Sequence, residues 1–201
     1  MTNLIPINLA VEDSLSEAVV RKILLKSSRP YSVGICYRKG GFGYLKKKIC
    51  GFNNVAKGTP FFVLTDLDNS ECPATLLGEW LPVPKHPNLL FRIAVREVES
   101  WLLADQDALS KFLGIKKESI PLDVDSEDNP KQLLINLTRK SKNRLQREAI
   151  VPSVGSTATT GPDYNGSLIS FVRDHWNIQE AMCRSPSLKR TVSAVIDFKP
   201  M

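Results

Sequence analysis

Histidine and cysteine, the usual zinc ligands, are scarce in this sequence of 201 residues. It contains two histidines, His86 and His175, and four cysteines, Cys36, Cys50, Cys72 and Cys183. The cysteines lie far apart and form no C-x-x-C pair. These counts and spacings argue against a zinc site, and isolated cysteines are typical of proteins in a reducing compartment.

The sequence also has no long apolar run. No segment approaches the ~20 apolar residues that a membrane-spanning helix needs. The chain begins Met-Thr-Asn-Leu-Ile-Pro, without a basic segment that leads into an apolar stretch, so we expect no signal peptide. Hydrophobic residues make up 42% of the chain and charged residues 24%, which is enough apolar material for a core. We therefore expect a cytoplasmic globular protein without a membrane partner.

Positive charge is concentrated in the last third of the chain. Residues 1–130 contain 16 basic and 16 acidic side chains, whereas residues 131–201 contain 11 basic and 5 acidic ones. The net charge of +6 therefore comes entirely from the C-terminal part. A neutral core with a basic extension favours a polyanionic partner such as nucleic acid, although a solvated lysine-rich surface gives the same numbers.

Apolar periodicity predicts alternating strands and helices, followed by helices alone. The predicted strands are 7–12, 31–37, 60–66 and 89–96, and the predicted helices are 14–27, 74–81, 98–114, 131–142, 165–177 and 187–197. Residues 38–48 are expected to open as a glycine-rich loop that leads into a helix, and Ser14 with Glu17 matches a capping box. This alternation predicts an α/β fold with a central parallel four-stranded sheet. We expect an α/β core at 1–117 and a basic helical extension at 118–201, with a long surface loop at 151–163.

Two aspartates directly follow the most apolar of the predicted strands. Alternate residues of a strand point to the same side, so Asp66 and Asp68 can converge where the chain leaves the sheet. Clustered carboxylates repel each other unless a cation lies between them, and a site lined by oxygen suits magnesium or manganese. The alternative is a turn at Asp68 and Asn69, with Asp66 capping a helix. We favour the metal site.

Further acids follow two other predicted strands. Glu12 ends the first strand, and Glu99 lies just beyond the fourth. Because the carboxyl ends of parallel strands share one edge of the sheet, both can join the aspartate pair, with Glu99 placed to hold a second ion. The alternative is that these acids stabilise helix N-termini.

Basic residues surround the glycines that follow the second predicted strand. Arg38, Lys39 and Lys46 to Lys48 are interleaved with Phe42 and Tyr44, a composition that suits contact with phosphates and bases. Lys189 and Arg190 are a second candidate pair, at the start of the last predicted helix. A solvated surface and an ordinary helix cap are the alternatives.

The acidic pattern resembles that of the Toprim superfamily, which has a glutamate after its first strand and Asp-x-Asp after its third. Val11-Glu12-Asp13 and Asp66-Leu67-Asp68 match these places, with Asp13 where the family usually has glycine. The segment Glu99-Ser100-Trp101-Leu102-Leu103-Ala104-Asp105 and the pair Ser185-Pro186 resemble those of small stand-alone Toprim-like proteins of bacterial defence and mobile-element loci. Those proteins are often encoded beside an ATPase.

The resemblance implies metal-dependent cleavage of a phosphodiester in antiviral defence, together with a partner such as an ATPase. Glu12, Asp66 and Asp68 would bind Mg²⁺ or Mn²⁺, with Glu99 at a second ion. The similar overcoming-lysogenisation-defect nucleases have a further acid four residues after the glutamate. Ser16 occupies that place here and Glu17 follows it, so Glu17 is the candidate ligand. The resemblance leaves open DNA or RNA as substrate and a homo- or hetero-oligomer as the assembly.

Two other functions compete with a nuclease. Asp66-Leu67-Asp68-Asn69-Ser70 also resembles the nucleophile loop of haloacid-dehalogenase-like phosphohydrolases, although two predicted strands precede it here. The other alternative is a non-catalytic subunit that binds nucleic acid or a protein partner.

Overall fold

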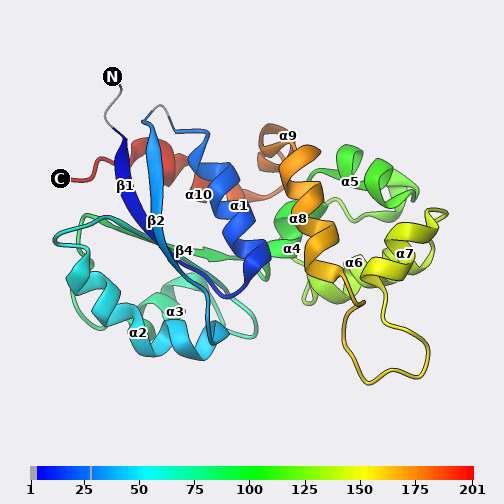
Figure 1. Cartoon of the computed structure of the whole chain (residues 1–201), viewed down its shortest axis with the longest axis horizontal. Coiled ribbons are helices and arrows are strands. Elements are labelled where there is room, and N and C mark those ends of the chain that lie inside the picture. The colour runs from blue at the N-terminus through cyan, green and yellow to red at the C-terminus, as the bar shows by residue number, and fades with distance from the viewer. Residues whose placement is uncertain (1–3, 28) are drawn as a thin grey trace.

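The computed structural model describes residues 4–27 and 29–201, and it has a four-stranded parallel sheet, which lies in the left half of Figure 1. The strands are β1 (Ile5–Ala10), β2 (Tyr31–Tyr37), β3 (Phe61–Asp66) and β4 (Leu89–Ala94), in the spatial order β2-β1-β3-β4. The predicted α/β fold with a parallel sheet is confirmed. Residues 1–3, part of the segment in which we expect no signal peptide, lie outside the described residues.

Helices cover both faces of the sheet, and helices with their connecting loops form the rest of the described chain (Figure 1). They are α1 (Ser14–Leu24), α2 (Gly41–Val55), α3 (Pro73–Trp80), α4 (Val98–Leu103), α5 (Gln106–Leu113), α6 (Pro130–Arg139), α7 (Arg144–Ile150), α8 (Tyr164–Asp174), α9 (Ile178–Met182) and α10 (Pro186–Asp197), with a 3-10 turn at Lys117–Ser119. Among the described residues, none of these helices combines the length and the apolar composition needed to span a bilayer.

Strand β3 shows why the sheet lies between two layers. Its alternating side chains are buried on both faces: Phe62 and Leu64 belong to the larger apolar cluster, and Phe61 and Val63 to the smaller one. Helices α2 and α3 contribute to the smaller cluster, and α1, α4, α8 and α10 to the larger one. A continuous apolar run is therefore required at β3, as its sequence predicts.

The C-terminal helices share the larger core with the sheet. Leu9 of β1, Trp101 of α4, Leu168 of α8 and Val192 of α10 all belong to one buried cluster. Helix α8 lies against α1, and α10 covers β4. Residues 118–201 are therefore continuous with the apolar interior that begins in residues 1–117.

The single helix predicted at 98–114 is two helices, because Asp105 interrupts it. The Asp105 carboxylate accepts hydrogen bonds from the backbone amide of Ala108, at 3.2 Å, and from that of Asn177, at 2.7 Å. The first bond caps α5, and the second ties α5 to the start of α9. Apolar periodicity runs through the break and cannot reveal it, because the partner Asn177 is distant in sequence.

Local capping corrects other predicted boundaries as well. Asp13, not Ser14, caps α1, and its carboxylate accepts the Ser16 amide at 2.8 Å. The segment 38–48 opens as a loop and leads into a helix, as predicted, and that helix begins at Gly41. The short helices α7 and α9 lie outside the predicted helical ranges. Each begins at a local cap, Asn143 for α7 and Asn177 for α9.

The segments at 99–105 and 185–186, singled out in the sequence analysis, lie where α4 packs against α10. The Trp101 indole donates to Ser187 Oγ at 2.7 Å, and the Asp125 carboxylate accepts from Ser185 Oγ at 2.7 Å and from the Ser187 amide at 2.8 Å. Ser185 caps α10, with Pro186 at its first helical position. These bonds fix α10 against α4, the helix that carries Glu99.

Candidate metal site at the carboxyl edge of the sheet

Glu12 and Asp66 meet at the point where the strand order reverses. The chain passes from β1 to β2 on one side and then to β3 on the other, and in open parallel sheets such a switch point, here between β1 and β3, is the usual place for a ligand. Glu12 follows β1, and its Oε1 accepts hydrogen bonds from Thr65 Oγ1 at 2.6 Å and from the Asp66 amide at 2.9 Å. The structure therefore brings together two acids that are 54 residues apart in the chain.

Asp66 joins the end of β3 to the start of α4. Its Oδ1 accepts the amide of Val98, the first residue of α4, at 2.9 Å. The following loop is held to the same region, because the Leu67 and Asp68 amides both donate to the Arg96 carbonyl. Arg96 in turn donates to the carbonyls of Asp68 and Ser70, at 3.2 and 3.0 Å. Asp66 is thus fixed between two backbone segments.

Asp68 is the exposed member of the acidic group. Its φ of 47° is left-handed, and Ser70 donates back to the Leu67 carbonyl at 3.0 Å, which closes a turn. Aspartate tolerates this conformation better than most residues do. The turn considered as an alternative at Asp68 is therefore present, but Asp66 caps α4 and not the helix that follows it in sequence, α3.

Glu99 approaches the cluster from α4 with two partners of its own. Its side chain is 3% exposed, and its Oε1 accepts the Tyr164 hydroxyl at 2.9 Å. The Lys131 ammonium lies 3.6 Å from the same oxygen. The neighbouring Glu97 accepts the Lys131 backbone amide at 2.7 Å, so α6 begins against this pair of glutamates.

Burial and mutual repulsion make this cluster electrostatically costly. Burial, followed by the charges of Glu99 and Glu12, raises the pKa of Asp66 well above its usual range. Burial also raises the pKa of Glu12 and of Glu99, in the latter case against the opposing effect of Lys131. Although burial lowers it, the surrounding carboxylates raise the pKa of Lys131 overall. Lys131 is the cation that these acids hold.

The donor set suits a hard divalent cation. Glu12 and Asp66 each use one carboxylate oxygen in the bonds above, and across residues 4–27 and 29–201 the second oxygen of either makes no hydrogen bond. Oxygen-only sites of this kind favour magnesium or manganese. Within the same residues no three Asp, Glu, His or Cys side chains are already grouped as ligands, so ion binding requires the carboxylates to draw together.

Glu17 lies apart from this cluster. Its carboxylate accepts Arg21 Nε at 2.9 Å and forms an ion pair with Arg38 at 3.0 Å. These partners lower the pKa of Glu17 despite its partial burial. Glu17 therefore stabilises the joint between α1 and the end of β2, and we do not include it among the candidate ligands.

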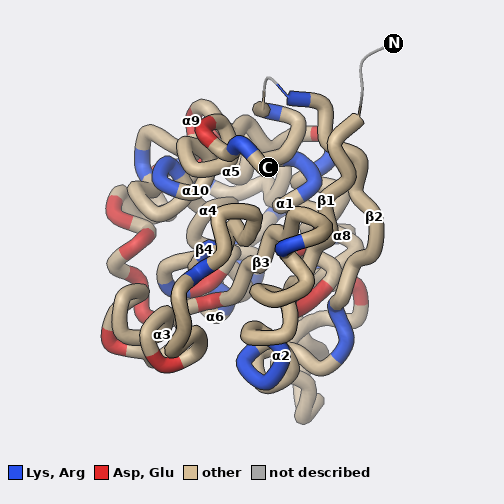
Figure 2. Tube along the Cα trace, turned by 90° about the vertical axis from the view of Figure 1, so that its left-hand side faces the viewer, with Lys and Arg blue, Asp and Glu red and all other residues tan. Residues whose placement is uncertain are grey.

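The basic residues predicted to contact nucleic acid fall on separate surfaces. Arg38 and Lys39 follow β2, and Arg38 is held by Glu17. Lys46, Lys47 and Lys48 are exposed along α2, where Figure 2 shows a basic stretch, and Lys46 lies 3.9 Å from Glu79. Lys189 and Arg190 are exposed on α10.

The aromatic residues between those cations, Phe42 and Tyr44, are partly buried. The ring centroids of Phe42 and Trp80 lie 4.7 Å apart, and those of Tyr44 and Phe52 lie 6.4 Å apart. Both side chains lie against the smaller apolar core. Amphipathic helix α2 turns one side of each ring toward this core, and contact of Phe42 and Tyr44 with bases stays a prediction.

Lys131 and Tyr164 were not among the residues selected from the sequence. Each belongs to a helix far along the chain from Glu99, so no local motif connects them. A weak signal exists at Lys131: a cation in the first turn of a helix opposes the helix dipole and calls for a nearby acid. Tyr164 offers no such signal.

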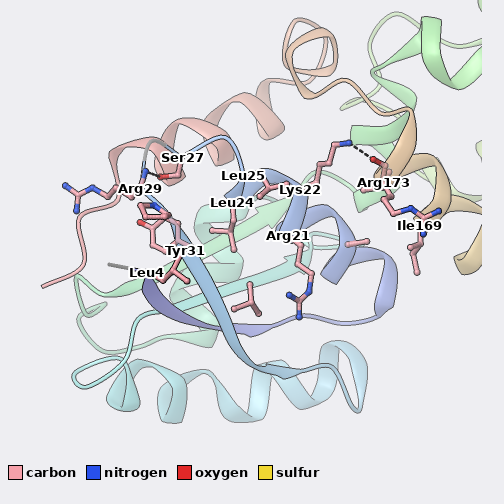
Figure 3. Close-up of a pocket in the computed structure, with 14 residues that line it drawn as sticks. Leu4, Arg21, Lys22, Leu24, Leu25, Ser27, Arg29, Tyr31, Ile169 and Arg173 are labelled. Atoms are coloured by element: carbon pink, nitrogen blue, oxygen red, sulfur yellow. Dashed lines mark hydrogen bonds between the residues drawn. The ribbon is translucent and has the colours of Figure 1, made fainter. Parts of the chain in front are cut away.

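Two pockets help to define the surroundings. One of about 350 Å³ adjoins the cluster and is lined by Asp13, Lys131, Tyr164 and the end of the 151–163 loop. Another, of about 750 Å³, lies between α1, β2 and α8 near the opposite end of the strands (Figure 3). There Lys22 donates to the Arg173 carbonyl at 2.7 Å. Of these two pockets, the first opens beside the acids.

Replacing Tyr164 with phenylalanine tests its hold on Glu99. Tyr164→Phe removes the hydroxyl that orients this carboxylate but keeps the buried ring. We expect manganese affinity to fall about 10-fold or more, as for other residues that orient metal ligands, with little change in thermal midpoint. Isothermal titration with Mn²⁺ measures the affinity. The same affinity in both proteins would mean that Glu99 takes no part in binding the ion.

Comparison of the chain with protein-family models, with curated proteins and with solved structures gave no match.

Proposed function

We propose that the protein is a metal-dependent nuclease of the Toprim type, which hydrolyses phosphodiesters with magnesium or manganese. The observation that carries the proposal is the convergence of Glu12, Asp66, Asp68 and Glu99 at the carboxyl edge of the sheet. Four acids at one edge are costly unless a cation offsets them, and among the described residues Lys131 forms the one ion pair with any of their carboxylates.

The residues divide into three roles in this proposal. Glu12, Asp66 and Asp68 would hold the ion, and Glu99, positioned by Tyr164, would complete the site or hold a second ion. When bound, such an ion polarises the phosphate and activates a water molecule. Lys131, already directed at Glu99, would place its ammonium against the negative charge that develops on the phosphate.

Nucleic acid is the substrate class that the charge distribution favours. The excess of basic residues lies in 131–201, the segment that supplies Lys131 and borders the cluster with the 151–163 loop. Cations on such a surface would contact the backbone and fix its register. A role in antiviral defence and a partner such as an ATPase are proposals that come from the resemblance of the sequence.

The Asp68→Asn variant provides the direct test of hydrolysis. Asp68 is exposed, so the substitution removes a candidate ligand without disturbing the core. We expect cleavage to fall at least about 100-fold, as when a charge-stabilising group is lost, with an unchanged thermal midpoint. The assay uses plasmid DNA, single-stranded DNA and RNA with Mg²⁺, Mn²⁺ or EDTA.

Asp128→Asn is the matched control for that assay. Asp128 is an exposed acid in the loop before α6, and its replacement should leave cleavage intact. Wild-type cleavage by Asp68→Asn would rule out the proposed site. Binding of nucleic acid without turnover in any metal would instead favour the non-catalytic subunit.

A second candidate activity is phosphomonoester hydrolysis of the haloacid-dehalogenase type. One observation favours it: Lys131, Glu97 and Glu99 supply the later lysine and acids that such a mechanism requires. Asp66 would then be the nucleophile. Turnover of small phosphomonoesters with a trapped phospho-Asp66 would establish this activity in place of the nuclease.

A further inference from the structure

Two arginines, Arg92 and Arg190, come together beside β4. Arg92 lies on β4, half-buried, and its Nε donates to Thr191 Oγ1 of α10 at 3.3 Å. Arg190 immediately precedes Thr191 on α10, and burial, followed by the charge of Arg190, lowers the pKa of Arg92. Across residues 4–27 and 29–201, neither arginine takes part in an ion pair.

These arginines line a small pocket of about 170 Å³ at the edge of the sheet. The pocket runs along the outer side of β4, from Arg190 to Pro73 and Ala74 in the first turn of α3. None of its lining residues is acidic. The positive end of the α3 dipole therefore adds to the field of the two guanidinium groups.

Holding two like charges together in a partly buried place is unfavourable unless an anion joins them. Arginine presents a planar fork of donors that matches the oxygens of a phosphate. The pocket also lies close to the acidic cluster. In the sheet, Arg92 lies opposite Leu64 and Ala94 lies opposite Asp66. Arg92 is therefore two residues, or about 7 Å along β4, before the position opposite Asp66.

We propose that Arg92 and Arg190 form a phosphate-binding site for the backbone of the nucleic-acid substrate, one or a few nucleotides away from the bond at the acidic cluster. This inference rests on the proposed function for the identity of the substrate. Arg190 is already a candidate contact with nucleic acid from the sequence, and this site assigns it a backbone phosphate. Arg92 is a new candidate contact, which the sequence alone does not indicate. Lys189, beside Arg190, does not line the pocket.

Binding of a fluorescent oligonucleotide without terminal phosphates, measured by anisotropy in EDTA over a range of salt concentrations, tests this site. We expect Arg190→Gln and Arg92→Gln each to weaken binding about tenfold, the loss of one charge-assisted contact. The slope of log affinity against log salt should fall by about one for each variant. Arg190 is exposed, so its variant remains informative even if Arg92→Gln fails to fold.

Arg29→Gln is the matched control, because it removes the same charge at the opposite end of the strands. It should bind within about twofold of wild type and keep the salt slope of wild type. Unchanged affinity and slope in Arg190→Gln would overturn the site. A loss of inorganic phosphate binding in the two arginine variants, with oligonucleotide binding intact, would also overturn it, because the pocket would then serve a free anion.

These measurements need no metal and no turnover, so they separate this inference from the nuclease proposal. If the wild type cleaves and both Arg190→Gln and Arg92→Gln bind the oligonucleotide normally, the phosphate-site proposal fails and the nuclease proposal stands. If binding depends on the two arginines but the protein never cleaves, the phosphate-site proposal stands and the nuclease proposal fails.

Discussion

Asp66→Asn is expected to stabilise the metal-free protein while it abolishes cleavage. Asparagine keeps the oxygen that accepts the Val98 amide but removes the charge that Glu99, Glu12 and Asp68 repel. Relief of such repulsion is worth about 1–3 kcal/mol of unfolding free energy. Chemical denaturation in EDTA measures this gain, and the nuclease assay measures the loss of activity.

The same variant should lose the stabilisation that Mn²⁺ gives to the wild type. A ligand that binds only the folded state raises stability in proportion to the logarithm of its concentration over its dissociation constant, and this gain disappears with the site. Asp128→Asn, with an exposed acid replaced, should show neither effect. A less stable Asp66→Asn protein, or one that retains its response to Mn²⁺, would contradict the proposed role of Asp66.

Lys131→Gln should have the opposite effect on stability and a comparable effect on activity. Without the ammonium, the buried carboxylate of Glu99 loses its cation. Loss of one partner of a fully buried pair costs about 3–5 kcal/mol, but Lys131 is 38% exposed, so we expect about 1–2 kcal/mol after solvent screening. Cleavage should fall about 100-fold to 1,000-fold.

Divalent metal should repair part of this instability. An ion at the cluster supplies positive charge that Lys131 no longer provides, so the rise in thermal midpoint with Mn²⁺ should be larger for Lys131→Gln than for wild type. Lys140→Gln, at the exposed C-terminal end of the same helix, controls for loss of a lysine. If Mn²⁺ raised the thermal midpoints of Lys131→Gln and Lys140→Gln equally, Lys131 and the ion would not occupy neighbouring places.

The fold was largely predictable because its strongest signals are local. The apolar run of β3 requires burial on both faces, and alternation of strands with helices implies a parallel sheet. The break at Asp105 was not predictable, since it depends on a bond to Asn177 that only the folded chain provides. The sequence likewise carried no signal for the order β2-β1-β3-β4, which places Glu12 beside Asp66.

The candidate site was predictable only where it follows strand ends. Glu12 and Asp66 each lie at the end of an apolar strand, and parallel strands bring such ends to one edge. Glu17 was misleading, because its spacing from Glu12 resembles that of a ligand while its actual partners, Arg21 and Arg38, are basic. Lys131 and Tyr164 come from helices whose packing on α4 no local pattern specifies.

The most direct test of the acidic cluster is a crystal structure of the protein soaked in Mn²⁺, with anomalous diffraction recorded at a wavelength where manganese scatters strongly. We predict an anomalous peak from a manganese ion that is coordinated by carboxylate oxygens of Asp66, Asp68 and Glu12. Glu99 should coordinate the same ion or a second one that gives its own peak. A structure without a peak at this edge of the sheet, with Lys131 still paired to Glu99 at saturating Mn²⁺, would contradict a metal site built on Asp66 and Asp68.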